Sequence, residues 1–277
     1  MSLGVDYASI DDNSAPNFAR AYAWGARFAI IRGAYTLGSV PKVDPTLARD
    51  RAAAGAAGLQ IGPYMILGWH ADPAAQVAKL IAAYGQPQRG DLPPALDIEG
   101  VSGVTAAQAL AKIETVLSEL HLHYRTVMIY TSAVWWSEQL DNATSTACGA
   151  CPLWLKVGYP WRARNPPHPE DIPAAAPVPV PWRTSGSPGA FIEQFQGDAI
   201  NVPGFTSTVD INKFRNYVAS SSDARTPWVR GKLNTLGFPT GSTNATLATA
   251  IRGFQARHGL SVDGVIGPIT WAALCAS

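Results

Sequence analysis

The sequence contains few of the residues that bind metals or perform thiol chemistry. Its 277 residues include three cysteines and five histidines, and no H-E-x-x-H segment is present. Cys148 and Cys151 form one C-x-x-C, which supplies only part of the four-ligand set of a structural zinc site. We therefore expect no metal site and no cofactor. The Cys148/Cys151 pair is consistent with a disulfide or with two free thiols, and Cys275 is expected to pack in a helix.

Charge of one sign and long apolar runs are also scarce. The formal net charge is +1 and no basic face is evident, which excludes the usual pattern of a nucleic-acid binder. No apolar run approaches the roughly 20 residues of a membrane span, so a membrane is not an expected partner. The first residues, MSLGVDYA, lack the charged start and apolar stretch of a signal peptide. We therefore expect synthesis in the cytoplasm.

Short apolar runs alternate with alanine-rich stretches of helical period. Eight runs have the character of strands: SLGVDY (2–7), FAIIRGAY (28–35), IGPYMIL (61–67), PALDIEG (94–100), TVMIYTS (126–132), PLWLKVGY (152–159), AFIEQF (190–195) and STVDINKF (207–214). Such alternation predicts a parallel sheet covered by helices, and this number of strands predicts a closed barrel. The predicted fold class is α/β.

Helices are expected in the first five gaps between these runs. The segments of helical period are about 15–24, 45–57, 73–84, 105–120 and 133–140. The last three runs have no clear helix between them. The sequence thus predicts an irregular (β/α) barrel of eight strands and about five helices, in which five strand–helix units precede three strands.

Two further segments divide the chain. Residues 160–189 are rich in proline, which prevents a regular helix or a central strand there. This segment is either a loop beside the cleft or a surface insertion without a role. Residues 219–227, ASSSDARTP, have the composition of a linker. We therefore predict a barrel at 1–218 and a small all-α unit of three helices at 228–277.

Carboxylates near strand ends are the sharpest functional signal. Asp97 and Glu99 in LDIE are two residues apart, so both point to one face of a strand. Burying two such acids without a basic neighbour is costly unless they have a use. Asp6 ends the first run and Asp210 lies in the last, and these strands are neighbours in a closed barrel. We expect the four carboxylates to converge at one end of the barrel, as in a glycosidase.

Together these segments resemble glycoside hydrolase family 25, the lysozymes of fungi, bacteria and phages. The matching pieces, in the family's order, are GVDYAS, FAIIRGAY, AAAGAAGLQIGPYMIL, LDIE, VMIYTS, PLWLKVGY, IEQFQ and VDINKF. The resemblance implies a barrel of eight strands and five helices. It also implies cleavage of the β-1,4 bond between N-acetylmuramic acid and N-acetylglucosamine in peptidoglycan. Retention of configuration is expected, with the substrate's N-acetyl group as nucleophile.

The same resemblance implies roles for individual residues. Glu99 matches the catalytic acid, and Asp97 matches the partner often proposed to orient the N-acetyl group. Asp6 and Asp210 match two flanking aspartates. Aromatic side chains near strand ends can stack on sugars or pack in the core. Apart from the resemblance, Arg32 interrupts an apolar run and is expected to pair with one of the acids, in a structural or a functional role. The candidate substrate-binding residues are Tyr64, Trp69, Tyr130, Trp154, Tyr159, Gln194 and Arg32.

The C-terminal unit resembles a peptidoglycan-binding domain of the three-helix type. It carries F-Q-x-x-x-G-L at 254–260 and D-G-x-x-G-x-x-T-W at 263–271. Gly264 and Gly267 permit a tight turn, and Thr270 and Trp271 begin a packed helix. The expected partner is therefore bacterial peptidoglycan, reached by phage lysis or by secretion, and the enzyme is expected to act as a monomer.

Two other classes of function compete with a muramidase. One is a wall hydrolase of another bond. A zinc amidase would need clustered metal ligands that are absent, and a thiol peptidase would need Cys148 or Cys151 near a histidine, which nothing in the sequence supports. The other is an inactive barrel that only binds glycan, and the presence of all four acids argues against it.

Overall fold

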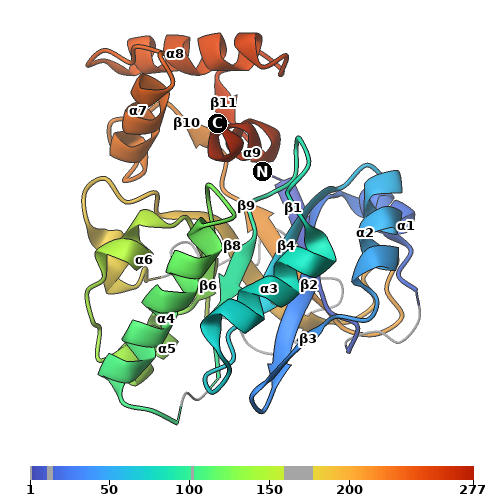
Figure 1. The fold of residues 1–277 in the computed structure, drawn as a ribbon. Helices are drawn as coiled ribbons and strands as arrows, with labels where there is room; N and C mark the ends of the chain where they lie inside the picture. Colours follow the sequence, from blue (N-terminus) through green and yellow to red (C-terminus); the bar gives the residue numbers. More distant parts are fainter. Residues whose placement is uncertain (1, 11–14, 101–102, 159–176) are drawn as a thin grey trace.

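Eight strands close into a barrel in the computed structural model, which describes residues 2–10, 15–100, 103–158 and 177–277 (Figure 1). The strands are β1 (Ser2–Tyr7), β2 (Ala26–Leu37), β4 (Gln60–Ile66), β5 (Ala95–Asp97), β6 (Met128–Thr131), β7 (Leu153–Lys156), β8 (Ala190–Ala199) and β9 (Val209–Phe214). Their order is β1-β9-β8-β7-β6-β5-β4-β2, and β1 pairs with β2 to complete the ring. Each predicted run overlaps one of these strands, so the predicted barrel is confirmed.

The parallel order predicted from the alternation ends at β8. β9 runs antiparallel to both of its neighbours, because a short connection without a crossover helix returns the chain in the opposite direction. This reversal brings the beginning of β9 to the end of the barrel where the parallel strands finish. We call that end the mouth and the opposite end the base. A short additional strand, β3 (Val40–Val43), extends the sheet beyond β2 and was not predicted.

Helices surround the barrel on its outside (Figure 1). The predicted helices are confirmed as α1 (Phe18–Trp24), α2 (Leu47–Ala56), α3 (Pro73–Tyr84), α4 (Ala106–His121) and α5 (Ala133–Leu140). Side-chain caps fix where some of them begin: Asp72 accepts a hydrogen bond from the backbone of α3, and Thr105 forms a capping box at α4. The short α6 (Thr146–Ala150) and the 3-10 turn η2 (Val180–Arg183) were not predicted.

The barrel strands are buried on both faces. Phe28 and Ile30 of β2 belong to the core inside the barrel, whereas Ala29 and Ile31 belong to the layer between the sheet and the helices. The interior is closely packed, since a Cβ atom on Gly4 would lie 2.2 Å from the ring of Phe28. Glycine is therefore required at this position of β1.

The C-terminal unit contains α7 (Thr226–Thr235), α8 (Asn244–Arg257) and α9 (Pro268–Ala276), as predicted, with a two-residue strand β11 (Val265–Ile266). Gln255 explains the sequence motif of this unit. Its side-chain oxygen accepts a hydrogen bond from Gly264 N at 2.8 Å, and its amide nitrogen donates to Asp263 at 2.7 Å. Gly264 has a φ of 76°, which glycine adopts readily. The motif thus joins α8 to the turn before α9.

The C-terminal unit packs against the base of the barrel (Figure 1). Trp271 of α9 is fully buried and stacks on Phe191 of β8, with ring centroids 5.2 Å apart. It also packs against Phe214 of β9, with ring centroids 5.5 Å apart. β10 (Tyr217–Val218), which follows β9, pairs with β11 of the C-terminal unit. One apolar core therefore continues from the barrel interior into the C-terminal unit.

Arg225 ties the segment between the two units to the base. Its guanidinium donates to the Asp223 carboxylate at 2.7 Å and to the carbonyl oxygen of Arg215 at 2.6 Å. It also lies over the ring of Phe191, 4.8 Å from the centroid. Because Arg215 and Phe191 belong to the barrel and Asp223 to the segment itself, Arg225 holds the segment against the barrel.

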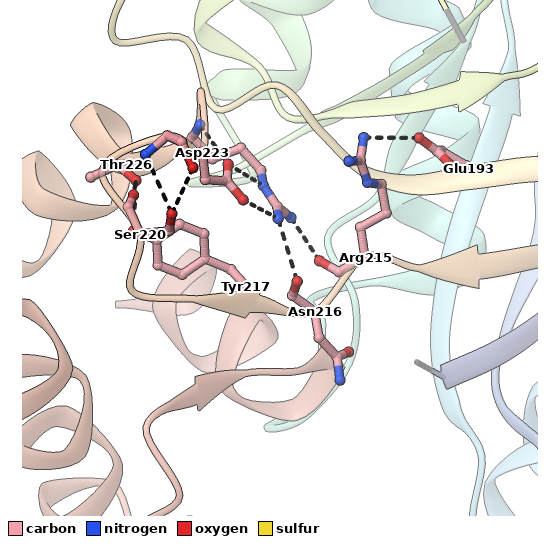
Figure 2. Close-up of polar contacts among 9 residues, drawn as sticks. Glu193, Arg215, Asn216, Tyr217, Ser220, Asp223 and Thr226 are labelled. Carbon is pink, nitrogen blue, oxygen red and sulfur yellow. Dashed lines mark hydrogen bonds and ion pairs between the residues drawn. The ribbon is translucent and has the colours of Figure 1, made fainter. Parts of the chain in front are cut away.

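Figure 2 shows the surroundings of this segment: Arg215 reaches Glu193 of β8, and Tyr217 lies beside Thr226. The hydroxyl oxygens of Tyr217 and Thr226 are 2.9 Å apart, and Tyr217 is fully buried. The division of the chain at 219–227 stays a prediction, since residues of this segment contact both units.

Candidate active site

Asp97 and Glu99 lie where β5 reaches the mouth. β5 ends at Asp97, and Glu99 follows two residues later, beyond the strand. Asp97 is 4% exposed, whereas the side chain of Glu99 is 45% exposed. The short strand thus places one acid inside the barrel and the other on the rim of the mouth, which is the catalytic end of related barrels.

A hydrogen-bond network joins Asp6 and Asp210, which are direct partners in the register of β1 and β9. The amide nitrogen of Gln194 donates to Asp6 at 3.0 Å and to Asp210 at 2.9 Å. The amide nitrogen of Asn212 donates to Asp6 at 2.7 Å. The two carboxylates therefore lie side by side, held by neutral N–H donors.

The four acids act on one another electrostatically. Burial raises the pKa of Asp97 well above its ordinary value, the charges of Glu99, Asp6 and Asp210 raise it further, and Lys156 opposes the increase. The Oδ1 atom of Asp97 is buried and has no hydrogen-bond partner among the described residues. A raised pKa and a buried oxygen without a hydrogen-bond partner are more typical of a functional carboxyl group than of a structural ion pair. The structure thus brings the four predicted acids together, while their roles stay a prediction.

Three of the predicted aromatic residues form a floor beneath these acids. Tyr130 donates to the side-chain oxygen of Gln194 at 2.8 Å, and the indole of Trp154 donates to Asn212 at 2.7 Å. Tyr64 packs edge-on against Trp154, with ring centroids 6.0 Å apart. Tyr64, Tyr130 and Trp154 are 7%, 4% and 1% exposed. They support the network from below, and their contact with sugar stays a prediction.

The rim beside Glu99 contains two tryptophans and a lysine. Trp69 stacks on Trp135, with centroids 5.8 Å apart and planes inclined by 16°. The indole of Trp135 donates to the carbonyl oxygen of Gly100 at 2.6 Å. Lys156 ends β7, and its Nζ lies 3.8 Å from Glu99 Oε2. Neither Trp135 nor Lys156 was predicted as a site residue, although a lysine at the end of an apolar strand was a visible signal in the sequence.

Arg32 pairs with Asp44, so the expectation that it pairs with one of the four acids is wrong. Its Nε and Nη2 atoms each lie 2.9 Å from Asp44 Oδ2. Burial raises the pKa of Asp44, but hydrogen bonds from Thr46 and Ser9 and the charge of Arg32 outweigh burial and lower it. The segment after the unpredicted β3 supplies this closer carboxylate. A role for Arg32 in substrate binding stays a prediction.

The proline-rich segment is only partly described. Tyr159 and residues 160–176 lie outside the described residues, so the placement of this loop beside the cleft stays a prediction. Trp182, from the described remainder, is buried, and its indole donates to the carbonyl oxygen of Cys151 at 2.7 Å. This part of the segment packs against α6 rather than against the acids.

The three cysteines are free and buried. Cys151 Sγ lies 3.7 Å from His121 Nε2, a proximity that was not predicted. Burial raises the pKa of Cys148 and of Cys151 to about 12, so neither thiol is ionised near neutral pH. The thiol-peptidase alternative therefore gains no support from this contact.

Within the described ranges, no three or more His, Cys, Asp or Glu side chains are arranged to hold a metal ion. In the same part of the chain, every helix is too short or too polar to cross a membrane.

Comparison with known proteins supports the predicted class. The model of the family described as Glycosyl hydrolases family 25 matches residues 5–170, and that of a peptidoglycan binding domain matches residues 222–274. A search of curated proteins found no match. The first match spans β1 to β7 and includes Asp6, Asp97 and Glu99, whereas Asp210 lies beyond it.

Solved structures share the fold. The bacterial lysozyme from Streptomyces coelicolor is 22% identical, with a TM-score of 0.62, and the match covers 77% of this chain and 92% of that one. A family GH25 lysozyme from Aspergillus fumigatus is 25% identical, with a TM-score of 0.60 and coverage of 77% and 93%. A muramidase from Trichobolus zukalii is 23% identical, with a TM-score of 0.59 and coverage of 83% and 100%.

The family match covers more than half of the chain and includes the strand ends that carry three of the four acids. A barrel of this topology and a C-terminal unit that matches a peptidoglycan-binding family agree with it. The chain belongs to glycosyl hydrolases family 25 and, as the sequence predicts, is a peptidoglycan hydrolase of the lysozyme class.

Proposed function

We propose that this enzyme is a muramidase that cleaves the β-1,4 bond between N-acetylmuramic acid and N-acetylglucosamine, with Glu99 as general acid. The contrast between Glu99 and Asp97 carries the proposal. Glu99 is on the rim and 45% exposed, while Asp97 is buried beneath it with an open Oδ1 atom. The two carboxyl groups are therefore suited to different parts of a bound sugar, the bridging oxygen and a substituent of the ring.

The cleavage step uses both groups. Glu99 gives its proton to the glycosidic oxygen while the bond from that oxygen to the anomeric carbon breaks. The carbonyl oxygen of the substrate's N-acetyl group forms a bond to the anomeric carbon from the opposite face. Asp97 accepts the N–H hydrogen bond of that group through its open Oδ1 and stabilises the positive charge of the resulting oxazolinium ring.

Water completes the reaction. It attacks the anomeric carbon from the face that the leaving group has vacated and gives a proton to the Glu99 carboxylate. The bond to the N-acetyl oxygen breaks, so the N-acetyl group is restored and the configuration is retained. Asp6 and Asp210 add negative charge below the sugar, which favours the oxocarbenium-like transition state.

Substrate binding uses the rim of the mouth, and wall binding uses the C-terminal unit. Trp69, stacked on Trp135, offers an aromatic face to a sugar next to the scissile bond. The C-terminal unit holds the barrel on the wall from the base, so the mouth stays open to the glycan. The enzyme acts as a monomer and reaches the wall by phage lysis or by secretion.

Digestion of purified peptidoglycan tests the proposal. Products are reduced with borohydride and identified by mass spectrometry. New reduced N-acetylmuramic acid ends are expected, whereas reduced N-acetylglucosamine ends or peptides released from intact glycan would overturn the assignment. Binding to several walls without any cleavage would favour a glycan-binding protein instead.

A Glu99→Gln variant tests the assignment of the acid. The substitution keeps the shape of the side chain but removes its proton, so we expect cleavage to fall by at least about a hundredfold. Wall binding and the melting temperature serve as controls and should stay unchanged. Wall lysis at the wild-type rate would rule out Glu99 as the acid.

A further inference from the structure

Glu99 lies beyond the end of the strand that carries it. β5 ends at Asp97, and Ile98 N donates to the carbonyl oxygen of Tyr130, in β6, at 2.9 Å. Glu99 follows on the rim, with 45% of its side chain exposed. A general acid must be held within hydrogen-bond reach of the oxygen that it protonates. An acid placed past the strand therefore needs support from outside the sheet.

A side chain holds the backbone on the far side of Glu99. Gly100 has a φ of 76°, a conformation that glycine adopts readily, so the chain turns directly after the acid. The carbonyl oxygen of Gly100 accepts the indole N–H of Trp135 at 2.6 Å. Hydrogen bonds at Ile98 and at Gly100 thus bracket Glu99.

The fold holds Trp135 itself in place. Ser132, which follows β6, caps α5, and its hydroxyl oxygen accepts the backbone N–H of Trp135 at 3.0 Å. The ring stacks on Trp69 and packs edge-on against the fully buried Trp136, with centroids 6.5 Å apart in the second pair. A ring fixed by packing can hold the Gly100 carbonyl at little further cost in conformational entropy.

The ring of Trp135 also lines a cavity of about 160 Å³ beside Glu99. Stacking on a sugar needs only the face of a ring, which phenylalanine would also supply. The N–H edge of Trp135 instead binds the backbone next to the acid. Sugar stacking does not explain this use of the N–H, whereas a need to hold the turn after Glu99 does.

We propose that Trp135 is a positioning residue, which holds Glu99 beside the glycosidic oxygen through its hydrogen bond to Gly100. The inference rests on the proposed muramidase function, in which Glu99 gives its proton to that oxygen. Without the N–H the turn can move, so proton transfer slows while the sugar still binds.

Variants that remove the N–H but keep a ring test this role. Trp135→Phe is the first, and incorporation of 3-benzothienylalanine at position 135, in which sulfur replaces the N–H, keeps both rings. Trp182→Phe is the matched control, because its buried indole also donates to a backbone carbonyl oxygen, that of Cys151, at 2.7 Å. Melting temperatures measure what each substitution costs the fold.

Two substrates separate proton donation from binding. The first is a peptidoglycan oligosaccharide, whose sugar leaving group needs a proton from the acid. The second is a dinitrophenyl glycoside of the wall disaccharide that ends in N-acetylmuramic acid, whose leaving group departs without protonation. Steady-state rates give kcat and KM for the first and kcat/KM for the second.

On the oligosaccharide, both changes at position 135 should lower kcat about tenfold, as expected for the loss of one hydrogen bond, with KM within about twofold of the wild type. On the dinitrophenyl glycoside, kcat/KM should stay within about twofold. Trp182→Phe should lower the melting temperature and leave the kinetics on both substrates unchanged.

Several results would overturn the positioning role. They are an unchanged kcat, a rise in KM alone, an equal loss on both substrates, and an equal loss in Trp182→Phe. A loss in Trp135→Phe that the benzothienyl analogue does not share would also overturn it, because ring size rather than the N–H would then be the cause.

Glu99→Gln separates this inference from the proposed function. Cleavage of the oligosaccharide that persists in Glu99→Gln would overturn the general acid itself. Loss of that cleavage in Glu99→Gln, together with unchanged kinetics for both changes at position 135, would overturn the positioning role alone.

Discussion

The mouth and the base of the barrel differ in what they bury: polar groups at the mouth and aromatic rings at the base. At the mouth, four carboxyl groups lie near one another, and Asp97 Oδ1 and Thr131 Oγ1 are buried without partners among the described residues. At the base, the rings of Phe191, Phe214 and Trp271 fill one continuous apolar core. Unpaired polar groups cost stability, whereas buried aromatic area supplies it. The aromatic rings buried at the base therefore stabilise the end of the barrel opposite the unpaired carboxyl oxygen, although Trp271 Nε1 is itself buried without a hydrogen-bond partner among the described residues.

The two ends also use charge differently. At the base, Asp223 and Arg225 form an ion pair whose atoms are 2.7 Å apart, with further hydrogen bonds to backbone carbonyl oxygens. At the mouth, Asp97 is buried, and its Oδ1 atom has no hydrogen-bond partner among the described residues. A satisfied pair stabilises a fold, while an unsatisfied acid remains available for chemistry.

The largest expected effect is on activity, at the mouth. Asp97→Asn should lower kcat by about a hundredfold or more, because the amide cannot support the developing positive charge. The melting temperature should stay equal or rise, since a buried acid is removed. Reducing-end release and calorimetry measure the two quantities. A lower melting temperature together with lost activity would indicate a structural role for Asp97.

The second largest effect is expected at the base, on the free energy of unfolding. Trp271→Ala should lower the free energy of unfolding by about 3–5 kcal/mol, because it leaves a cavity between Phe191 and Phe214. Calorimetry should show one transition at a lower temperature, since the barrel and the C-terminal unit share a core. The folded variant should still cleave soluble glycan fragments. A barrel transition that does not move would show that the two units are energetically independent.

The pH dependence of stability should have opposite signs at the two ends. The pKa of Asp97 is raised by burial and by its acidic neighbours, so stability is lost as pH rises from about 4, the ordinary value, through the folded-state value. Burial raises the pKa of Asp223, but hydrogen bonds from Arg225 outweigh it and lower the pKa. Its contribution is therefore lost as pH falls through the folded-state value.

Melting temperatures across pH check these signs. Asp97→Asn should reduce the decline toward higher pH, and Asp223→Asn should reduce the decline toward acid. The two variants control for each other, because each should leave unchanged the decline in melting temperature that the other reduces. If both variants changed the decline on the same side of the pH range, the separation of the two ends would be contradicted.

The smallest effect is expected outside both ends. Cys151→Ala should leave peptidoglycan cleavage unchanged within about twofold, because a buried thiol with a pKa of about 12 is not a nucleophile. Product analysis by mass spectrometry, with and without a thiol-alkylating reagent, measures this. Loss of peptide release in the variant would revive the thiol-peptidase alternative, which the contact between Cys151 and His121 alone does not support.

Much of the barrel could be predicted because its pattern is local. Apolar runs and helical periods identified eight strands and five helices, and positions near strand ends identified the four acids. Gln194 was predicted as a polar residue within an apolar run and from the family resemblance. The direction of β9 was not local information, yet it decides that Asp210 faces Asp6 at the mouth. The partner of Arg32 was also wrong, since Asp44 lies after a short strand that carries no clear signal of its own.

The sequence by itself determined the fold class and, through the resemblance of its motifs, the family. It also predicted the four acids, because hydrophobic period and residue type near strand ends require no knowledge of distant contacts. Only the tertiary structure decided which acid is buried and which is exposed, since β5 stops between Asp97 and Glu99. It also decided that Trp135 reaches the backbone beside Glu99 and that Trp271 closes the base. Burial and partners depend on how neighbouring strands and the C-terminal unit pack, and packing is a property of the whole chain.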